Sequence, residues 1–476
     1  MTIIATNITA RQGGFELRDI SFSLHNNENM LITGASGSGK TMLAMALSGR
    51  LFVAGSLKKE YATDTDLLPE TVYVEQRYTV RNRSNTVDGY YQQRYNGAEC
   101  DDSYTVAEEL HAVSDDEERI DFLLHELSVA YLKNKPLLQL SSGEHKRFQL
   151  IKALLRPSQL LILDDPFTGL DADGRVKLNM ILNVVADGGT MLILVAGMHH
   201  PLPDCMTHVL ALDGGRQTAF TKKRLFIPAQ RCTTHALSSS SLPLQRSKWD
   251  FENAILMKNV TVEYDGKTIL NNISWQVKKG ERWLLKGRNG AGKSTLMSLV
   301  VADNPQAYAN EIYLFDRRRG TGETIWDIKR NIGFVSPELC AYFDRALSCF
   351  DTVASGFFDT TGVYRTLSVE QTRHIHHWLK ALDVASLAQK RLSEVSSGAQ
   401  RLFLLIRSII KQPPLLILDE PCQGLDESQT ELFIHLVDDI CSQSDTTIVY
   451  VSHYENDVPA CISHVLELEG GTIMKR

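Results

Sequence analysis

Short apolar runs recur along the chain and predict strands that are buried on both faces. Residues 160–163 and 415–418 are apolar at every position, and an aspartate follows each run, as expected of parallel core strands. Met191–Val195 and Thr447–Val451 have a similar apolar character. None of these runs approaches the ~20 consecutive apolar residues of a membrane-spanning helix. The pattern therefore predicts core strands and no membrane span.

The chain contains the same series of motifs twice, in the same order. A glycine-rich motif that begins at Gly34 recurs 253 residues later at Gly287, and the apolar run that ends at Asp164 recurs 255 residues later at Asp419. Each copy shows a strand, a glycine loop and a helix, then a polar helical insertion, then a helix and an apolar strand. This order predicts a duplicated α/β domain with a mostly parallel core sheet and a helical subdomain.

The stretch between the two copies is weakly patterned and predicts a connector. It contains four consecutive serines at 238–241, followed by a Leu-Pro pair, which is typical of a flexible linker. We therefore expect a first domain at 1–225, a linker at 226–250 and a second domain at 251–476.

Composition and charge agree with a globular protein and exclude several other classes. Hydrophobic residues make up 43% and charged residues 22% of the chain, which excludes a disordered, collagen-like or coiled-coil protein. The net charge of −7 gives no reason to expect nucleic acid or an anionic membrane as a partner. The eight cysteines form no CxxC pair, which argues against zinc ribbons and disulfide frameworks. The N-terminus lacks the features of a signal peptide, so a cytoplasmic location is expected.

The two glycine-rich motifs match the pattern GxxxxGK[ST], which binds phosphate. Its glycines allow backbone N–H groups to converge on an anion at a helix N-terminus, and its lysine reaches the β- and γ-phosphates of a nucleotide. Two copies with matching downstream motifs make a plain glycine turn a poor explanation. The residues expected to bind nucleotide are Gly34, Ser36, Gly37, Gly39, Lys40 and Thr41 in the first copy and Gly287, Asn289, Gly290, Gly292, Lys293, Ser294 and Thr295 in the second.

The aspartates at the ends of the apolar runs are candidate metal ligands. Asp164 and Asp419 would lie at the carboxyl edge of the sheet, where parallel-sheet proteins bind their ligands. Together with the Thr41 and Ser294 hydroxyls, they would hold Mg²⁺. The alternative is that these aspartates only terminate core strands.

Each copy contains four motifs in the same order: the phosphate loop, a Ser-Ser-Gly signature at 141–143 or 396–398, a strand that ends in an acidic pair, and a Gly-Leu-Asp that follows. Together they resemble the nucleotide-binding domain of ABC ATPases. The resemblance occurs twice and covers nearly the whole chain. The resemblance implies two P-loop NTPase domains, each with a helical subdomain and a small antiparallel β subdomain. It also implies ATP and Mg²⁺ as ligands, and two domains that pair head-to-tail so that each signature completes the opposite ATP site.

The resemblance assigns residues to two composite sites within one chain. Site one would join Lys40, Thr41, Gln76, Asp164 and Asp165 to Ser396, Ser397 and Gly398. Site two would join Lys293, Ser294, Asp419, Glu420 and His453 to Ser141, Ser142 and Gly143.

The two expected sites differ in their catalytic residues. The glutamate that the family uses to orient the attacking water is Glu420 in the second copy, but its counterpart is the shorter Asp165. The family's γ-phosphate-contacting histidine is His453, whereas Gly197 occupies that position in the first copy, with His199 and His200 shortly after it. We therefore expect site two to hydrolyse ATP and site one mainly to hold it.

Other family positions also diverge between the copies. Gln76, which would also contact Mg²⁺, corresponds to Pro337, next to which Glu338 could act as a substitute. The adenine-stacking aromatic is expected to be Tyr264, with Arg11 as its first-copy counterpart. Site one also faces Ala399, where the family often has a glutamine.

The second half resembles the ModF-type tandem ABC ATPases, which are named for molybdate-transport loci and are also called photorepair-like. The resemblance rests on residues 314–329 and on the motifs around Asp419 and His453. Within this stretch, a solvated turn is the favoured explanation of Arg317, Arg318 and Arg319.

Two main functions and a third remain open at the level of sequence. The resemblance favours an ATPase that energises a separate membrane permease, with molybdate or a related oxyanion as cargo, located in the cytoplasm or peripherally at the inner face of the membrane. The alternative is an ATP-driven clamp on the ribosome, RNA or DNA. The Tyr- and Arg-rich insertion at 77–104 would suit a partner surface or single-stranded nucleic acid, but a family insertion that packs on its own helices is the favoured explanation of this stretch. A nucleotide-sensing regulator is the third.

Overall fold

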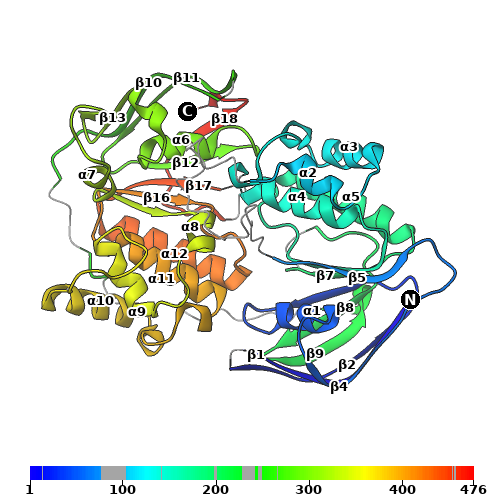
Figure 1. Cartoon of the computed structure of the whole chain (residues 1–476). Coiled ribbons are helices and arrows are strands. Elements are labelled where there is room, and N and C mark those ends of the chain that lie inside the picture. The colour runs from blue at the N-terminus through cyan, green and yellow to red at the C-terminus, as the bar shows by residue number, and fades with distance from the viewer. Residues whose placement is uncertain are drawn as a thin grey trace. The chain divides into compact units, whose positions relative to one another are not determined.

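The computed structural model describes residues 1–12, 14–76, 103–140, 142–197, 201–227, 242–244, 249–264, 266–452, 454 and 457–475. The chain divides into two compact units, Met1–Arg231 and Cys232–Arg476, and each is described by itself below (Figure 1). Of the predicted site residues, Ser141 and His453 lie outside the described residues, as do His199, His200 and most of the insertion at 77–104.

In the described part of the first unit, one sheet of nine strands has the order β4-β1-β2-β9-β8-β3-β7-β6-β5. Strands β8, β3, β7, β6 and β5 pair in parallel, whereas β1 pairs with β2 and β4 in antiparallel fashion. The strands are β1 (Thr2–Gln12), β2 (Phe15–Leu24), β3 (Met30–Gly34), β4 (Val53–Glu60), β5 (Leu68–Val74), β6 (Ser158–Asp164), β7 (Met191–Val195), β8 (His208–Asp213) and β9 (Arg216–Lys222).

The helices of the first unit cover the two faces of its parallel strands. Helix α1 follows the phosphate loop and packs with the β1–β2 hairpin on one face, and α4 and α5 pack on the other. The helical insertion lies between β5 and β6, as predicted. The helices are α1 (Lys40–Ser48), α2 (Val106–His111), α3 (Glu117–Glu126), α4 (Ser142–Leu154) and α5 (Ala172–Asp187).

The second unit repeats this architecture with two separate sheets among its described residues. The core sheet has the order β15-β16-β17-β12-β18-β19 and is parallel except for β19, and an antiparallel sheet has the order β11-β10-β13-β14. The strands are β10 (Asn253–Tyr264), β11 (Lys267–Lys278), β12 (Arg282–Gly287), β13 (Glu311–Leu314), β14 (Arg317–Arg318), β15 (Ile332–Val335), β16 (Leu415–Asp419), β17 (Thr447–Val451), β18 (His464–Glu469) and β19 (Thr472–Lys475).

The helices of the second unit match those of the first at the predicted offset. Helix α11 begins 255 residues after α4, and α12 begins 255 residues after α5. The helices are α6 (Lys293–Val300), α7 (Ile325–Lys329), α8 (Pro337–Tyr342), α9 (Cys349–Ala354), α10 (Val369–Ala381), α11 (Ser397–Ile409) and α12 (Glu427–Gln443). The predicted architecture is confirmed: two α/β domains, each with a mostly parallel core sheet, a helical subdomain and antiparallel β strands.

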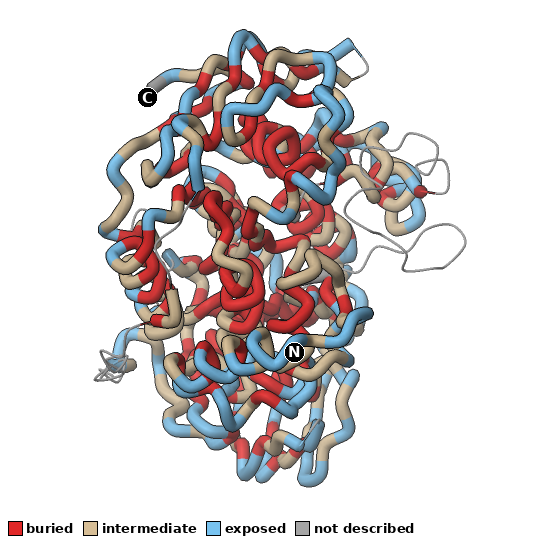
Figure 2. Tube along the Cα trace, turned by 90° about the vertical axis from the view of Figure 1, so that its left-hand side faces the viewer, coloured by how far each residue is buried: buried red, intermediate tan, exposed pale blue. Residues whose placement is uncertain are grey.

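The apolar runs form central strands with both faces buried, as their patterns predict. Leu160 and Ile162 face the core layer that contains α1, whereas Leu161 and Leu163 face the layer that contains α4 and α5. Figure 2 shows buried residues gathered in the interior of each unit and exposed residues along its outside. Because both faces are covered, the acidic residue that ends each strand is delivered to a fixed point at the sheet edge. No helix among the described residues is both long enough and apolar enough to cross a membrane.

Part of the expected linker packs against the second unit. Leu242 is 7% exposed within a core cluster of that unit, and its backbone N–H donates to Gln443 Oε1 at 2.9 Å. The carbonyl of Pro243 accepts from Gln412 Nε2 at 3.2 Å. The expected flexible connector is therefore wrong at 242–244, which is held by the second unit, while the domain limits 1–225 and 251–476 stay a prediction.

The expected solvated arginine turn is correct for two of its three residues. Arg317 and Arg318 are exposed, but the Arg319 side chain is 1% exposed and forms an ion pair with Glu323 at 3.2 Å. The Arg319 guanidinium also lies over the Tyr308 ring, 5.0 Å from its centroid. The run of three basic residues gave no sign of this. Glu323 is only four residues further along the chain, but the burial of Arg319 and its contact with the Tyr308 ring depend on the fold.

Candidate nucleotide-binding sites

The first phosphate loop has a backbone that only glycine can adopt. Gly34 and Gly39 have φ values of 144° and 100°, and a Cβ at these positions would lie 2.1 Å from the Leu212 carbonyl oxygen and 2.5 Å from Leu17 Cδ2. The Lys40 ammonium donates to the Gly34 and Ala35 carbonyls, both at 2.8 Å. The loop thus wraps around the lysine at the N-terminus of α1, which is the arrangement of an anion site.

The second phosphate loop repeats this geometry. Gly287 and Gly292 have φ values of 152° and 97°, and a Cβ there would meet the Leu468 carbonyl oxygen at 2.5 Å and Leu270 Cδ2 at 2.6 Å. Lys293 Nζ donates to the Gly287 carbonyl at 2.8 Å. Of the other predicted residues, Ser36 and Gly37 lie in the first loop and Asn289 and Gly290 in the second. Thr41 lies in the first turn of α1, and Ser294 and Thr295 lie in the first turn of α6.

The predicted metal-binding aspartates lie where the sequence places them. Asp164 ends β6, is 1% exposed and accepts from the Tyr73 hydroxyl at 3.3 Å. Burial raises its pKa to about 6, against the lowering effect of a hydrogen bond from Thr41. Asp419 ends β16 and is half-buried. The hydroxyl and carboxylate oxygens that meet at Thr41 and Asp164 are the hard donors that suit Mg²⁺.

The two candidate catalytic carboxylates share an unusual backbone conformation. Asp165 and Glu420 have φ values of 48° and 42°, which non-glycine residues rarely adopt. Each backbone N–H donates to a neighbouring strand at 2.9 Å, Asp165 to Val195 and Glu420 to Val451. The two side chains therefore leave equivalent strands from equivalent backbones, and they differ by one methylene.

Gln76 lies beside the first carboxylate, and its counterpart in the second unit has no amide. Gln76 Nε2 donates to Asp165 Oδ2 at 3.1 Å. Strand pairing aligns Val74 with Val335, and Gln76 therefore corresponds to Pro337, as expected. Pro337 begins α8, and Glu338 after it is 7% exposed.

The hairpin register corrects the expected counterpart of Tyr264. Tyr264 pairs with Lys267 at the end of its hairpin, and Gln12 pairs with Phe15 in the same way in the first unit. The expected correspondence with Arg11 is therefore wrong by one residue. The Tyr264 hydroxyl accepts from Asn304 Nδ2 at 2.8 Å and the residue is half-buried.

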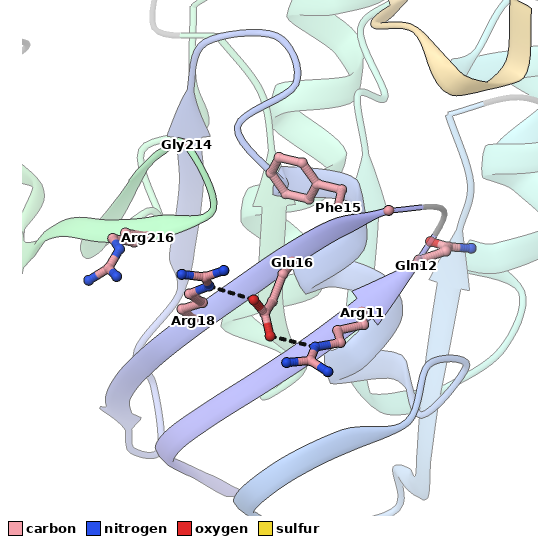
Figure 3. A pocket seen from close by; sticks show the side chains of 8 residues that line it. Arg11, Gln12, Phe15, Glu16, Arg18, Gly214 and Arg216 are labelled. Carbon is pink, nitrogen blue, oxygen red and sulfur yellow. Dashed lines mark hydrogen bonds and ion pairs between the residues drawn. The ribbon is translucent and has the colours of Figure 1, made fainter. Parts of the chain in front are cut away.

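An open cavity of about 600 Å³ lies at the end of the first hairpin. Figure 3 shows Glu16 between Arg11 and Arg18, and the Nε of each arginine donates to it at 2.5 Å. These hydrogen bonds lower the pKa of Glu16. Phe15 is close to the phosphate loop, since a Cβ on Gly39 would lie 3.0 Å from its ring. The lining residues are Arg11, Gln12, Gly14, Phe15, Glu16, Arg18, Gly214 and Arg216.

The two signatures lie at the starts of equivalent helices. In the second unit, Ser396 caps α11, and its hydroxyl accepts from the Ala399 N–H at 3.3 Å, which leaves Ser397 and Gly398 in the first turn. In the first unit, Ser142 and Gly143 begin α4. Both signatures therefore present helix N-termini, which favour anions.

Lys146 was missed by the sequence reasoning. From α4, its ammonium donates to the carbonyls of Glu75 at 3.1 Å, Gln76 at 3.4 Å and Asp164 at 3.3 Å. Burial lowers its pKa to about 8, although Asp165 and Asp164 act to raise it. Arg401 holds the same position in α11 and donates to the Gln423 carbonyl at 3.2 Å. A basic residue at the same place in both repeats was the signal that could have revealed this role.

Replacing Lys146 with methionine should weaken ATP binding at the first phosphate loop. The change removes a cation that holds the segments bearing Gln76 and Asp164, and charge-assisted hydrogen bonds of this kind justify a loss of about tenfold in affinity. Lys146→Arg should retain most of the affinity, because arginine serves at this place in the second unit. Equilibrium binding of labelled ATP measures the affinity of both variants. Equal affinity in Lys146→Met and the unmodified chain would show that Lys146 does not support ATP binding.

The comparisons with known proteins agree with this geometry. A family model described as ABC transporter matches residues 17–168 and 270–423. The chain is 35% identical over 97% of its length to the ABC transporter ATP-binding protein ModF of Escherichia coli, 96% of which is covered. It is 29% identical over 98% of its length to an uncharacterized ABC transporter ATP-binding protein of Schizosaccharomyces pombe, also 98% covered.

A solved structure named RNase-L Inhibitor shares the fold over the whole chain. It has a TM-score of 0.55 and 16% identity and covers 98% of this chain and 90% of that one. Two family matches, two phosphate loops and two equivalent acidic strand ends lead to one conclusion. The chain belongs to the ABC transporter family and is a tandem ABC ATPase.

Proposed function

We propose that the chain is a two-site ATPase in which the second phosphate loop turns ATP over and the first mainly holds it. The observation that carries the proposal is the pair Asp165 and Glu420, which leave equivalent strands from the same backbone conformation with different reach. A carboxylate that is one methylene shorter places the attacking water poorly, and an error of about 1 Å can cost on the order of 10²-fold in rate.

Each ATP would be completed by the signature of the other domain. Lys40 and its loop would be paired with 396–398, and Lys293 and its loop with 141–143. The proposal is supported by the family membership and by the helix N-termini that follow both signatures. Mg²⁺ would be held by Thr41, Asp164 and Gln76 in site one and by Ser294 and Asp419 in site two. When bound, it would neutralise phosphate charge.

The nucleotide that stays on the protein tests the asymmetry. After incubation with excess Mg²⁺ and ATP labelled at the α-phosphate, followed by rapid removal of free nucleotide, the protein should retain ATP and ADP in similar amounts. Thin-layer chromatography of the released label measures the ratio. Retention of ADP alone would show that both sites hydrolyse and would overturn the proposal.

The partner of this ATPase is proposed to be a separate membrane permease. ModF is named as an ABC transporter ATP-binding protein, and the zinc uptake system ATP-binding protein ZurA of Listeria innocua is 32% identical over 45% of this chain, with 82% of it covered. Molybdate as cargo rests on the resemblance to ModF-type proteins alone.

Capture of the ATP-bound state tests the partner. Tagged Glu420→Gln protein, recovered from cells in Mg²⁺ and ATP, should bring down an integral membrane protein that wild-type protein in ADP does not. Recovery of ribosomes, RNA or DNA in its place would reverse the assignment. One solved structure of the same fold is titled as ribosome-bound archaeal Pelota and ABCE1, but at 18% identity it shows the fold alone.

A further inference from the structure

The signature turn of the second unit is covered by a side chain from another helix. Gln429, in the first turn of α12, packs directly on Gly398, since a Cβ on that glycine would lie 2.3 Å from Gln429 Cδ. Gln429 also forms a capping box with Asp426, in which its N–H donates to Asp426 Oδ1 at 2.8 Å. One residue therefore joins the signature turn to the start of the helix that follows the catalytic carboxylate.

The first unit makes the same junction with a different residue. Arg147, on α4, forms an ion pair with Asp171 at 2.8 Å, and Asp171 caps α5 as Asp426 caps α12. Arg147 also donates to the Leu127 carbonyl at 3.0 Å, and its side chain is 7% exposed.

The residue that makes the contact between the two helices comes from the signature helix in the first unit and from the following helix in the second. At the offset of 255 residues, Gln429 corresponds to Gly174, and Arg147 corresponds to Leu402. Gly174 is buried, and a Cβ there would lie 3.3 Å from Arg147 Nη2, so the space that Gln429 uses in one unit belongs to arginine in the other. The two units therefore fill the same space in different ways: the first with Arg147 beside Gly174, and the second with Gln429 where position 402 is a leucine.

We propose that Gln429 and Arg147 are positioning residues, each of which holds the signature helix of its own unit against the helix that follows the carboxylate. The inference rests on the proposed function, in which each signature completes the opposite ATP site. Gln429 then controls ATP retention by site one, and Arg147 controls turnover at site two. Arg147 needs glycine at position 174, and Gln429 needs leucine at position 402, because an arginine and a glutamine would compete for the same space.

Exchange of the pairs tests this inference. Gln429→Gly alone and Leu402→Arg alone should each raise the ATP concentration for half-maximal ATP retention by about tenfold, which is within the usual coupling of contacting residues. The double variant Leu402→Arg with Gln429→Gly reproduces the pair of the first unit and should recover most of the affinity. Arg147→Leu should instead lower kcat for ATP hydrolysis with little change in ATP retention.

The outcomes separate this inference from the proposed function. If wild-type protein neither retains ATP nor hydrolyses it, the proposed function fails. If wild-type protein does both and Gln429→Gly behaves like it, or if the double variant is no better than the singles, the positioning role is wrong. Gln429→Ala replaces Gln429→Gly if the glycine prevents folding. Folding of the Gln429 and Leu402 variants is followed by tryptophan fluorescence, since all five tryptophans lie in the second unit, and folding of Arg147→Leu is followed by circular dichroism.

Discussion

Steady-state ATP turnover should fall by about 10²–10³-fold in Glu420→Gln and change by no more than a few-fold in Asp165→Asn. Glutamine cannot accept a proton from the attacking water, and Glu420 is the carboxylate with the longer reach at the two equivalent strand ends. Asp165 contributes little to turnover if its site mainly holds ATP. Release of inorganic phosphate at saturating ATP and Mg²⁺ measures both rates.

The matched variants guard against misreading a loss of binding as a loss of catalysis. Glu420→Gln and Asp165→Asn should both bind ATP as well as wild-type protein does, since neither change removes a phosphate-loop residue. Asp165→Glu serves as the reciprocal control, because it gives the first site the longer carboxylate. Equal losses in Glu420→Gln and Asp165→Asn, or a loss in Asp165→Asn alone, would contradict the asymmetry.

The phosphate loops and carboxylates could be predicted because local sequence dictates their geometry. The four glycines at 34, 39, 287 and 292 adopt φ values that other residues rarely do, so their spacing alone fixes the turn. The acidic strand ends follow from apolar runs whose alternate residues face two different core layers. Because each motif occurs twice at nearly the same spacing, the assignment of a motif in one copy supports its assignment in the other.

The counterpart of Tyr264 could not be predicted, because it depends on strand irregularities. Both hairpins have register shifts, but the second has two more, one of them between Val262 and Glu263 near the hairpin end. This extra residue moves Tyr264 opposite Lys267 and aligns it with Gln12, whereas a constant offset from the phosphate loops selects Arg11. Bulges leave little trace in a single sequence.

Contacts of polar and charged side chains between elements were also beyond the sequence. Lys146 donates to the carbonyls of Glu75 and Gln76, which are 71 and 70 residues away, and Gln429 covers a glycine on another helix. Arg319 belonged to a basic run whose neighbours are exposed, and its burial depends on Glu323 and on the Tyr308 ring. Periodicity and motif spacing identify strands and loops, but they do not show which polar side chain bridges two of them.

Replacing Glu323 with glutamine should destabilise the second unit by about 3 kcal/mol, the usual cost of removing one partner of a buried ion pair. The Glu323 side chain is 5% exposed and accepts from the N–H groups of Gly320 at 2.6 Å and Thr321 at 3.0 Å as well as from Arg319. Burial alone would raise the pKa of Glu323, but these hydrogen bonds outweigh it and lower the pKa to about 2. The glutamine would leave the buried Arg319 without a counter-ion.

The pH dependence has a definite sign. Because the folded-state pKa of Glu323 lies below the ordinary value of 4.5, the stability it contributes is fully present above pH 4.5 and is lost as the pH falls toward 2. The difference in unfolding free energy between wild-type protein and Glu323→Gln should therefore be constant at neutral pH and shrink below about pH 4.5.

Urea unfolding followed by tryptophan fluorescence measures this effect in the full chain. All five tryptophans, at 249, 275, 283, 326 and 378, lie in the second unit, so the signal reports on that unit. Arg318→Gln is the matched control, since this exposed neighbour should change stability by less than about 0.5 kcal/mol. The double variant Arg319→Met with Glu323→Leu should cost less than Glu323→Gln alone, because it removes both buried charges. A Glu323→Gln protein as stable as the control would show that the pair contributes nothing, and that Arg319 is held by the Tyr308 ring and its surroundings.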